Sequence, residues 1–521
     1  MSETITAQTV KKWLQDGEEI AFLDVREHGQ YGEGHPFFVA SVPYSRLELD
    51  IARLVPRLST RIVLLDDDDG VAEHAHTRLV ALGYTDIHVL EHGVRGWQRA
   101  GLQLFKGVHL PSKTFGELAE HAYDTPRIQA PELEAMLQHG EPVVVLDGRP
   151  IEEFHKMNIP GAICCPNIEL PYRIHALVSD ETTPIVINCA GRTRSIIGAQ
   201  TLINAGIRNP VYALENGTQG WFLNDLQLGH GNTQRYPDVR SDAPEFVERR
   251  EVAQTQARQH GVEVIDAEQL AGFWRDSERN TFLLDVRTPE EYAVGTVTNA
   301  VHAPGGQLLQ GTDLYVGVRG ARIVLVDTDG IRAPLTASWL RQMGHEAYVL
   351  SGDVEAKAVA SVSRENPVAH LPETTAQDVA QRLSLGPVRI VDVRASSKYR
   401  SAHIDGSVWS IRPRIAVQLG SDLRPLVLVA DDAAVAALAA SELEGVDAVF
   451  LKGDVQAWKT AGLPVVDSPD TPPDAACIDY LFFVHDRHDG NKEAARRYLA
   501  WETGLIAQLD ESELASFRVH H

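Results

Sequence analysis

The sequence predicts an α/β protein of four tandem domains, each a small parallel sheet flanked by helices, followed by a C-terminal helical tail. A tag of Leu or Val, Asp, any residue and Arg occurs four times, each time after an apolar run typical of a buried strand. A second apolar run and a helical pattern follow each tag, and such alternation favours a parallel sheet with helices on both faces. The tags are Leu23-Asp24-Val25-Arg26, Leu146-Asp147-Gly148-Arg149, Leu284-Asp285-Val286-Arg287 and Val391-Asp392-Val393-Arg394.

Each repeat closes on Gly-x-x-Gly-Trp or a remnant of it, at residues 93–97, 217–221, 352–354 and 453–458. The distance between successive tags suits one α/β domain of ordinary size for each tag. We predict domains over residues 1–108, 124–230, 261–360 and 370–466. A partly helical connector is expected over 231–260, and a linker with a helical tail over 467–521.

The composition excludes several classes of protein. The 521 residues carry a formal net charge of −24, which argues against a broad nucleic-acid or anionic-membrane surface. Four cysteines without a Cys-x-x-Cys pair exclude a disulfide scaffold, a zinc ribbon and a thioredoxin motif. The N-terminus lacks the features of a signal peptide, and no apolar run is long enough to span a bilayer. We therefore expect a cytoplasmic protein with reduced thiols.

We expect the reactive group of the chain in one short run, Cys189-Ala190-Gly191-Arg192-Thr193-Arg194-Ser195. It follows a strand-like stretch at 184–188 and precedes a helical pattern at 196–203, so the loop would lie at the positive end of a helix. A helix N-terminus and neighbouring cations lower the pKa of a cysteine and favour the reactive thiolate. Two arginines and backbone N–H groups would also form a cradle for an anion.

The Asp-x-Arg strand ends, the cysteine loop and the closing Gly-x-x-Gly-Trp together resemble the rhodanese homology domain. Its loop pattern, Cys-x-x-x-x-Arg-Ser/Thr, is met by Cys189, Arg194 and Ser195. The resemblance covers residues 5–466 as four domains, and the layout is similar to the tandem four-domain bacterial thiosulfate sulfurtransferases with one catalytic domain. The other three domains have no cysteine in the loop, where Asp66-Asp67-Asp68-Asp69, Asp327-Thr328-Asp329 and Ala430-Asp431-Asp432 stand instead. We expect these three to be inactive.

The resemblance implies that Cys189 takes a sulfane sulfur from thiosulfate or a similar donor and passes it, as a persulfide, to cyanide or a thiol. Arg192, expected to project from the loop, and Arg194 are candidates for binding the sulfonate oxygens. Arg194 could instead pair with a carboxylate such as Asp147. The remaining candidates for substrate binding are Ala190, Gly191, Thr193 and Ser195. No cofactor and no metal is required by this chemistry.

Outside the loop, Asp147 and Arg149 are expected to support the site, and Arg173 is a weaker candidate for a second anion contact. Cys164 and Cys165 are expected to pack in a buried strand. The loop at residues 485–490 invites a metal interpretation, but a polar turn is the simpler one. A further hypothesis is that the tail docks back on the repeats and contributes to the catalytic pocket.

Three alternatives stay open. A phosphatase of this fold class would need Cys-x5-Arg, whereas this loop is Cys-x4-Arg. A sulfur-relay carrier would use the same persulfide with another acceptor, and a rhodanese-fold scaffold or regulatory protein would explain the three domains without cysteine. The expected partners are a small anionic sulfur donor and a thiophilic acceptor, with neither nucleic acid nor membrane, and a homo-oligomer is left open.

Overall fold

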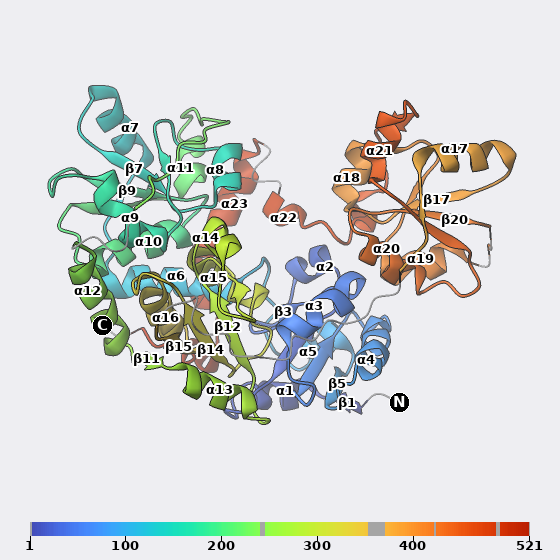
Figure 1. Ribbon diagram of the computed structural model, residues 1–521, viewed down its shortest axis with the longest axis horizontal. Coiled ribbons are helices and arrows are strands. Elements are labelled where there is room, and N and C mark those ends of the chain that lie inside the picture. Colours follow the sequence, from blue (N-terminus) through green and yellow to red (C-terminus); the bar gives the residue numbers. More distant parts are fainter. Residues whose placement is uncertain are drawn as a thin grey trace. The chain divides into compact units, whose positions relative to one another are not determined.

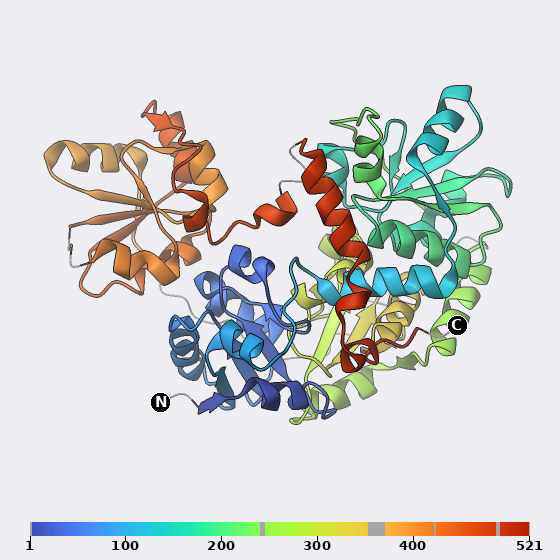
Figure 2. The same ribbon diagram turned by 180° about the vertical axis from the view of Figure 1, so that it is seen from behind.

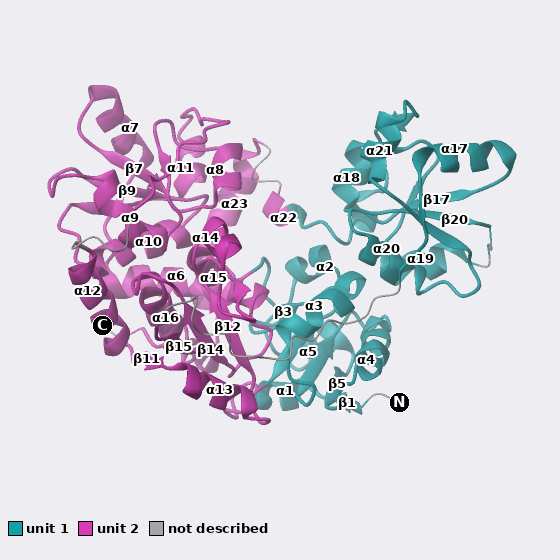
Figure 3. Cartoon of the chain, in the orientation of Figure 1, with its two compact units in different colours: residues 1–13, 20–108, 364–482 teal, residues 14–19, 109–363, 483–521 magenta. Residues whose placement is uncertain are grey.

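A computed structural model describes residues 3–239, 245–352, 370–420, 422, 424–485 and 490–519. Four sheets of five parallel strands follow one another along the chain, each flanked by helices (Figure 1). The chain divides into two compact units (Figure 3): residues 1–13, 20–108 and 364–482 form one, and residues 14–19, 109–363 and 483–521 form the other. The predicted fold class, with its helical C-terminal region, is confirmed.

The same strand order recurs in all four sheets: first, fifth, fourth, second, third. The strands of the first unit are β1 Glu3–Ile5, β2 Ala21–Asp24, β3 Ala40–Ser41, β4 Ile62–Leu65 and β5 Ile87–Leu90 in domain 1, and β16 Glu373–Thr374, β17 Arg389–Asp392, β19 Val408–Trp409, β20 Leu426–Val429 and β21 Ala448–Leu451 in domain 4. An antiparallel pair, β18 His403–Ile404 and β22 Val465–Val466, is added to domain 4. The helices of the first unit are α1 Ala7–Trp13, α2 His28–Glu33, α3 Leu47–Leu54, α4 Val71–Ala81, α5 Gly93–Arg99, α17 Ala376–Leu385, α18 Ser396–Ser401, α19 Arg412–Leu419, α20 Ala433–Ala440 and α21 Asp454–Thr460. Helix α22 Phe482–His485 begins at the last residue of the first unit and lies mostly in the second.

The second unit holds domains 2 and 3 and the C-terminal tail. Its strands are β6 Arg127–Ile128, β7 Val144–Asp147, β8 Ile163–Cys164, β9 Ile185–Asn188 and β10 Val211–Leu214 in domain 2, and β11 Glu263–Ile265, β12 Thr281–Asp285, β13 Val301–His302, β14 Arg322–Val326 and β15 Glu346–Leu350 in domain 3. Its helices are α6 Leu110–Tyr123, α7 Ala130–His139, α8 Ile151–Lys156, α9 Glu169–Leu177, α10 Thr193–Asn204, α11 Gly217–Leu223, α12 Glu245–Gln259, α13 Ala267–Arg275, α14 Pro289–Val294, α15 Gly305–Gln310, α16 Arg332–Gln342, α23 Lys492–Thr503 and α24 Glu511–Leu514.

The sheet of domain 2 is buried on both faces. Ile185 and Ile187 of the central strand β9 belong to one hydrophobic core, and Val186 belongs to the other. Side chains of a strand alternate between faces, so a strand buried on both sides reads as a continuous apolar run. The run at 185–187 therefore predicts the central strand, and the loop that follows this strand leaves the sheet at its carboxyl edge.

The Asp-x-Arg tag has one geometry in all four domains. Each arginine donates from both Nε and Nη2 to the tag aspartate, and its Nη2 also donates to the carbonyl eight residues further on. The accepting carbonyls are those of Gly34, Met157, Gly295 and Ala402. The tag thus fixes the chain after the second strand, in domains with and without a cysteine.

Tryptophans of the closing motif also repeat their contact. The indole N–H of Trp97, Trp221 and Trp458 each donates to the carbonyl six residues further on. The remnant in domain 3 lies largely outside the described residues, because 353 and 354 do not belong to them. Throughout the part of the chain described, every helix is too short or too polar to cross a bilayer.

Candidate active site around Cys189

Cys189 directly follows β9 at the carboxyl edge of the sheet, and α10 begins four residues later at Thr193. The cysteine is 2% exposed, and the Ser195 hydroxyl donates a hydrogen bond of 3.0 Å to its Sγ. Because the first N–H groups of α10 have no partners within the helix, the loop lies where negative charge is favoured. This arrangement suits a thiolate or a persulfide at Cys189.

The start of α11 holds the backbone of this loop. The Thr218 N–H donates to the Cys189 carbonyl at 2.8 Å, and the Gln219 Nε2 donates to the Ala190 carbonyl at 3.0 Å. Gly217 packs so closely that a Cβ there would lie 2.3 Å from the Cys189 carbonyl oxygen. The first position of Gly-x-x-Gly-Trp therefore has to be glycine, because any side chain there would collide with the cysteine loop.

Arg194 forms a two-pronged ion pair with Glu153 of α8, with N–O distances of 2.7 and 2.8 Å. Burial would lower the pKa of Arg194, but Glu153, and after it Cys189, raise this pKa above its ordinary value. The sequence analysis allowed a carboxylate partner such as Asp147. The structure instead pairs Arg194 with Glu153, while Asp147 binds Arg149 and Asn188.

The Arg194–Glu153 contact is one of four such latches. In each domain, the residue four positions after the tag arginine binds a residue that follows the central strand, the second residue after it in domains 1 and 4 and the sixth in domains 2 and 3. The pairs are Gln30–Asp67, Glu153–Arg194, Glu291–Arg332 and Lys398–Asp431. Three of these domains have no cysteine in the loop, so the latch belongs to the fold and holds the loop against the second helix.

Arg192 was expected to project from the loop as a substrate contact, but its side chain is buried against α6. It is 7% exposed, and its Nε and Nη2 donate to the two carboxylate oxygens of Glu117 at 2.7 and 2.9 Å. Nη2 also donates to Glu120. Both glutamates belong to α6, a helix at residues 110–123 that lies between the predicted domains 1–108 and 124–230 and packs along α10. A buried guanidinium needs such partners, because an unpaired charge is costly to bury.

The C-terminal helix α23 covers the same loop (Figure 2, where it is the red helix beside the cyan α6). Glu502 is 1% exposed, and its Oε1 accepts from Lys113 of α6 at 3.2 Å and from the Thr193 hydroxyl at 3.3 Å. Lys113 also donates to the hydroxyl of Tyr498. The tail therefore docks on domain 2 and contacts the cysteine loop, as the sequence hypothesis expected of it.

We predict that removing residues 490–521 slows persulfide formation at Cys189 at least tenfold and lowers the melting temperature. Deletion uncovers the loop and removes Glu502, whose charge-assisted hydrogen bonds with Lys113 and with the Thr193 hydroxyl contribute about 1.5–3 kcal/mol each. Stopped-flow kinetics and thermal unfolding of the truncated chain measure both effects. Unchanged kinetics and stability would show that the tail plays no part in the site.

The remaining candidates lie apart from the sulfur. Arg173 donates to Glu169 at 2.7 Å and stacks on Tyr236, and its hydrogen bonds among the described residues do not reach the cysteine loop. Glu169 also accepts from Arg332 of domain 3 at 2.8 Å, so this cluster joins domains 2 and 3. Arg173 thus lies in a structural ion cluster. Its assignment as an anion contact has no support from this geometry.

Cys164 and Cys165 are both buried, and they belong to the two opposite cores of domain 2. Burial raises the pKa of the Cys164 thiol to about 12 and that of Cys165 well above its ordinary range. Both side chains therefore stay protonated and inert at neutral pH. Their packing agrees with the expectation from sequence.

An aspartate stands in the place of Cys189 in domains 1 and 3. Asp66 and Asp327 each follow the central strand, and each carboxylate accepts the backbone N–H of the residue six positions later, at 3.1 and 2.7 Å. Ala72 and Ala333 are these donors, and Ser195 is the equivalent residue in domain 2. An internal carboxylate thus occupies the anion cradle in both domains, which explains why neither would bind an external anion there.

We predict that Asp327→Asn gains stability relative to the unchanged chain as the pH rises from 5 to 8. Burial, with the charge of Asp329, raises the pKa of Asp327 to about 7 in the folded protein. A raised pKa gives stability that is full below the ordinary carboxyl value of 3.8 and is lost as the pH rises from there to the folded value of about 7, by up to about 1.4 kcal/mol per pH unit. Unfolding at each pH measures the difference, and a constant difference would contradict the raised pKa.

Several residues of this site were not predicted from the sequence: Lys113, Glu117, Glu120, Glu153, Gln219, Tyr498 and Glu502. The sequence does contain a signal for Glu153, which stands four residues after its tag arginine. Gln30, Glu291 and Lys398 stand at the same distance from theirs. The spacing Asp327-x4-Arg332 likewise repeats Cys189-x4-Arg194. The residues on α6 and α23 had none, since nothing in their own segments indicates that they pack on a loop far away in the sequence.

Comparison with known proteins agrees with this geometry. The family model of the rhodanese-like domain matches residues 6–100, 129–224, 268–358 and 375–461. The chain belongs to the rhodanese-like family. The crystal structure of thiosulfate sulfurtransferase from Pseudomonas aeruginosa is 40% identical, covers 99% of this chain and 99% of its own, and gives a TM-score of 0.90. Together these matches support sulfurtransferase activity in general terms.

Two other solved structures each match about a fifth of the chain. The rhodanese-like domain of an Anabaena protein, solved by NMR, is 25% identical over 20% of this chain and 84% of its own, with a TM-score of 0.18. A protein from Bacillus halodurans is 22% identical over 20% and 78%, with a TM-score of 0.19. No curated protein gives a significant match to the chain. The assignment to the rhodanese-like family therefore depends on the family model and the Pseudomonas structure.

Among the described residues, no group of three or more His, Cys, Asp or Glu side chains is placed to hold a metal ion. Residues 486–489 of the loop considered for a metal lie outside that part of the chain.

Proposed function

We propose that this chain is a thiosulfate sulfurtransferase that works through a persulfide on Cys189. One observation carries the proposal: of four equivalent positions after the central strands, only that of domain 2 holds a cysteine, and its sulfur accepts the Ser195 hydroxyl at 3.0 Å. The equivalent residues are Asp66, Asp327 and Ala430. The 40% identity to a thiosulfate sulfurtransferase over the whole chain supports the same donor.

In the first half-reaction, the Cys189 thiolate attacks the outer sulfur of thiosulfate. The S–S bond of thiosulfate breaks, its electron pair leaves with sulfite, and Cys189 keeps one sulfur as a persulfide. Backbone N–H groups of the loop, from Ala190 to Arg194, would bind the sulfonate oxygens and the persulfide. Arg194, which is close enough to Cys189 for an electrostatic interaction, adds positive charge while it stays latched to Glu153.

In the second half-reaction, cyanide or a thiolate attacks the outer sulfur of the persulfide. The Cys189 S–S bond breaks, its electron pair returns to Sγ as a thiolate, and thiocyanate or an alkyl persulfide leaves. The three domains without cysteine take no part in this cycle. Their carboxylate-filled or cysteine-free loops support a structural role for them.

Intact-mass spectrometry of the full chain tests the proposal. Incubation with thiosulfate should add one sulfur atom, about 32 Da, and cyanide should remove it. Cys189→Ala should show no gain, while Cys164→Ala, which leaves the loop intact, should gain the sulfur normally. A gain only with another sulfur donor would favour a relay carrier, and no gain with any donor would favour a scaffold.

A further inference from the structure

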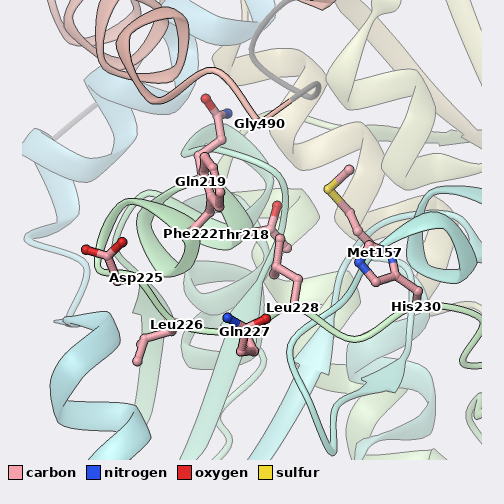
Figure 4. A pocket seen from close by; sticks show the side chains of 10 residues that line it. All are labelled: Met157, Thr218, Gln219, Phe222, Asp225, Leu226, Gln227, Leu228, His230 and Gly490. Carbon is pink, nitrogen blue, oxygen red and sulfur yellow. The ribbon is translucent and has the colours of Figure 1, made fainter.

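A cavity of about 710 Å³ lies between domain 4 and the chain segment that follows this domain. A smaller cavity of about 350 Å³ lies in domain 2, where Met157, Phe222 and Asp225 are among the residues that line it (Figure 4). The Asp225 carboxylate in that smaller cavity is already paired with Lys492. Binding sites for small molecules have volumes of about 300–1,000 Å³. The cavity of domain 4 is therefore large enough for a small organic molecule.

Apolar side chains form most of the wall of this larger cavity. The edge strand β19 contributes Val408 and Trp409, α19 contributes Val417, and the segment after β22 contributes Pro472 and Pro473. Val408 is 49% exposed and Val417 is 88% exposed, so both present apolar surface to solvent. Because removal of such surface from water is favourable, the wall suits a ligand with an apolar body.

The equivalent sheet edge in domain 2 is covered by the chain itself. Cys164 and Trp409 are equivalent, since each pairs with its tag aspartate. In domain 2, the Cys164 N–H donates to the Gln234 carbonyl at 2.9 Å, and the Tyr236 N–H donates to the Cys164 carbonyl at 3.1 Å. Residues 234–236 of the connector thus cover this edge of the sheet.

Domain 4 cannot repeat this pairing. Gly231 and Ser468 are equivalent, because each donates its N–H to the carbonyl six residues after the tag arginine of its domain. Five residues further on, domain 2 has Tyr236, whereas domain 4 has Pro473, which has no N–H to donate. Trp409 and Pro473 both line the cavity of domain 4. The cavity therefore lies at the edge that the connector covers in domain 2.

Arg414 is the one charged side chain among the described residues that line this cavity. Its Nη1 donates to the Ala476 carbonyl at 3.3 Å, which leaves other guanidinium donors for a ligand. Within the described part of the chain, no carboxylate is paired with Arg414. A guanidinium presents a fork of donors that matches the two oxygens of a carboxylate.

The other charged groups on the surrounding elements are paired with one another or lie in solvent, and none of them lines the cavity. The ion pairs are Lys398–Asp431, Arg400–Asp474, Arg412–Glu48 and Arg412–Glu442, and the exposed carboxylates are those of Asp405, Asp467 and Asp470. Solvent and salt screen exposed carboxylates. Arg414 therefore sets the charge preference of the cavity, which is for an anion.

We propose that this cavity binds a small carboxylate with an apolar body. The body packs against Trp409 and Val417, and the carboxylate accepts hydrogen bonds from Arg414. A peptide that adds a strand to β19 fits less well, because β19 is two residues long and Gln418 Nε2 already donates to the Trp409 carbonyl at 3.0 Å. The site contains no residue of the catalytic loop or of the second unit, so it does not depend on the proposed function.

Three ligands of similar size test the charge preference: 4-phenylbutyrate, 4-phenylbutan-1-ol and 4-phenylbutylamine. Isothermal titration calorimetry of the full chain measures the affinity of each. We expect 4-phenylbutyrate to bind about tenfold more tightly than the alcohol, which corresponds to one charge-assisted hydrogen bond, and the amine to bind more weakly than the alcohol. Equal affinities for the three ligands, or binding of none of them, would overturn the proposal.

Variants locate the ligand. Arg414→Gln should weaken the binding of 4-phenylbutyrate about tenfold and leave that of the alcohol unchanged. Val417→Asp places a carboxylate on the exposed part of the wall and should make the amine bind more tightly than the acid, whereas Val417→Asn should keep the original order. Arg382→Gln, at an exposed arginine of α17 outside the cavity, is the matched control and should change no affinity.

Sulfur loading and carboxylate binding are separable in this protein. Cys189→Ala should abolish sulfur loading and leave the binding of 4-phenylbutyrate unchanged, and loss of binding in this variant would place the ligand at the catalytic loop instead. An affinity for 4-phenylbutyrate that neither Arg414→Gln nor Val417→Asp alters would contradict the assignment of the cavity, whatever the result with thiosulfate.

Discussion

Gly217→Ala is expected to reduce persulfide formation at Cys189 at least tenfold and to destabilise the second unit. A Cβ at this position would lie 2.3 Å from the Cys189 carbonyl oxygen and 2.9 Å from that of Gly191. Both atoms are backbone, so they can move only if the loop moves. The backbone φ of +53° adds strain for any residue with a side chain.

Gly206→Ala is the matched control for this prediction. Gly206 has a φ of +76° at the end of α10, but a Cβ there meets no atom within 4 Å. Gly206→Ala should lower the free energy of unfolding by about 1 kcal/mol, because of backbone strain alone, and should leave sulfur loading unchanged. Intact-mass spectrometry at successive times measures the rate of sulfur loading, and thermal unfolding measures the stability. If the two variants behaved alike, the close approach of α11 to the loop would not matter for catalysis.

Glu117→Met is expected to destabilise the protein by about 3 kcal/mol, because among the described residues it leaves the buried Arg192 guanidinium with Glu120 as its one hydrogen-bonded carboxylate. Arg192→Met in the same chain should recover most of this loss. Replacing a whole buried ion pair by apolar side chains of similar volume is often neutral, whereas breaking the pair is not. Denaturant unfolding of both single variants and the double variant measures the coupling.

The double variant also decides the role of Arg192. If Arg192 acts by holding the loop on α6, the folded Glu117→Met/Arg192→Met chain should load sulfur from thiosulfate within about threefold of the normal rate. A loss of 100-fold or more in a stable double variant would show that the guanidinium contacts the donor, as the sequence analysis proposed. Glu132→Met, on the exposed face of α7, controls for removal of a glutamate as such.

The repeats and the cysteine loop could be predicted from the sequence because they depend on local order. Asp147 and Arg149 are two residues apart, and their ion pair forms within one strand end. Residues 185–187 form a short apolar run of β-branched side chains, which is typical of a strand buried on both faces. The loop from Cys189 to Ser195 could be predicted for the same reason, although its helix begins at Thr193, three residues earlier than the predicted helical pattern.

The surroundings of the sulfur were decided by tertiary structure. Glu117 and Lys113 lie on a helix between the predicted domains, and Glu502 lies more than 300 residues beyond Cys189. No pattern of charge or hydropathy in these segments says which loop they will cover, since their contacts form only when α6 and α23 pack against α10 and α11. The sequence alone therefore determined the fold and the nucleophile, because both follow from local periodicity and spacing. Packing between distant segments decided which carboxylates hold the arginines and which acceptors face the loop.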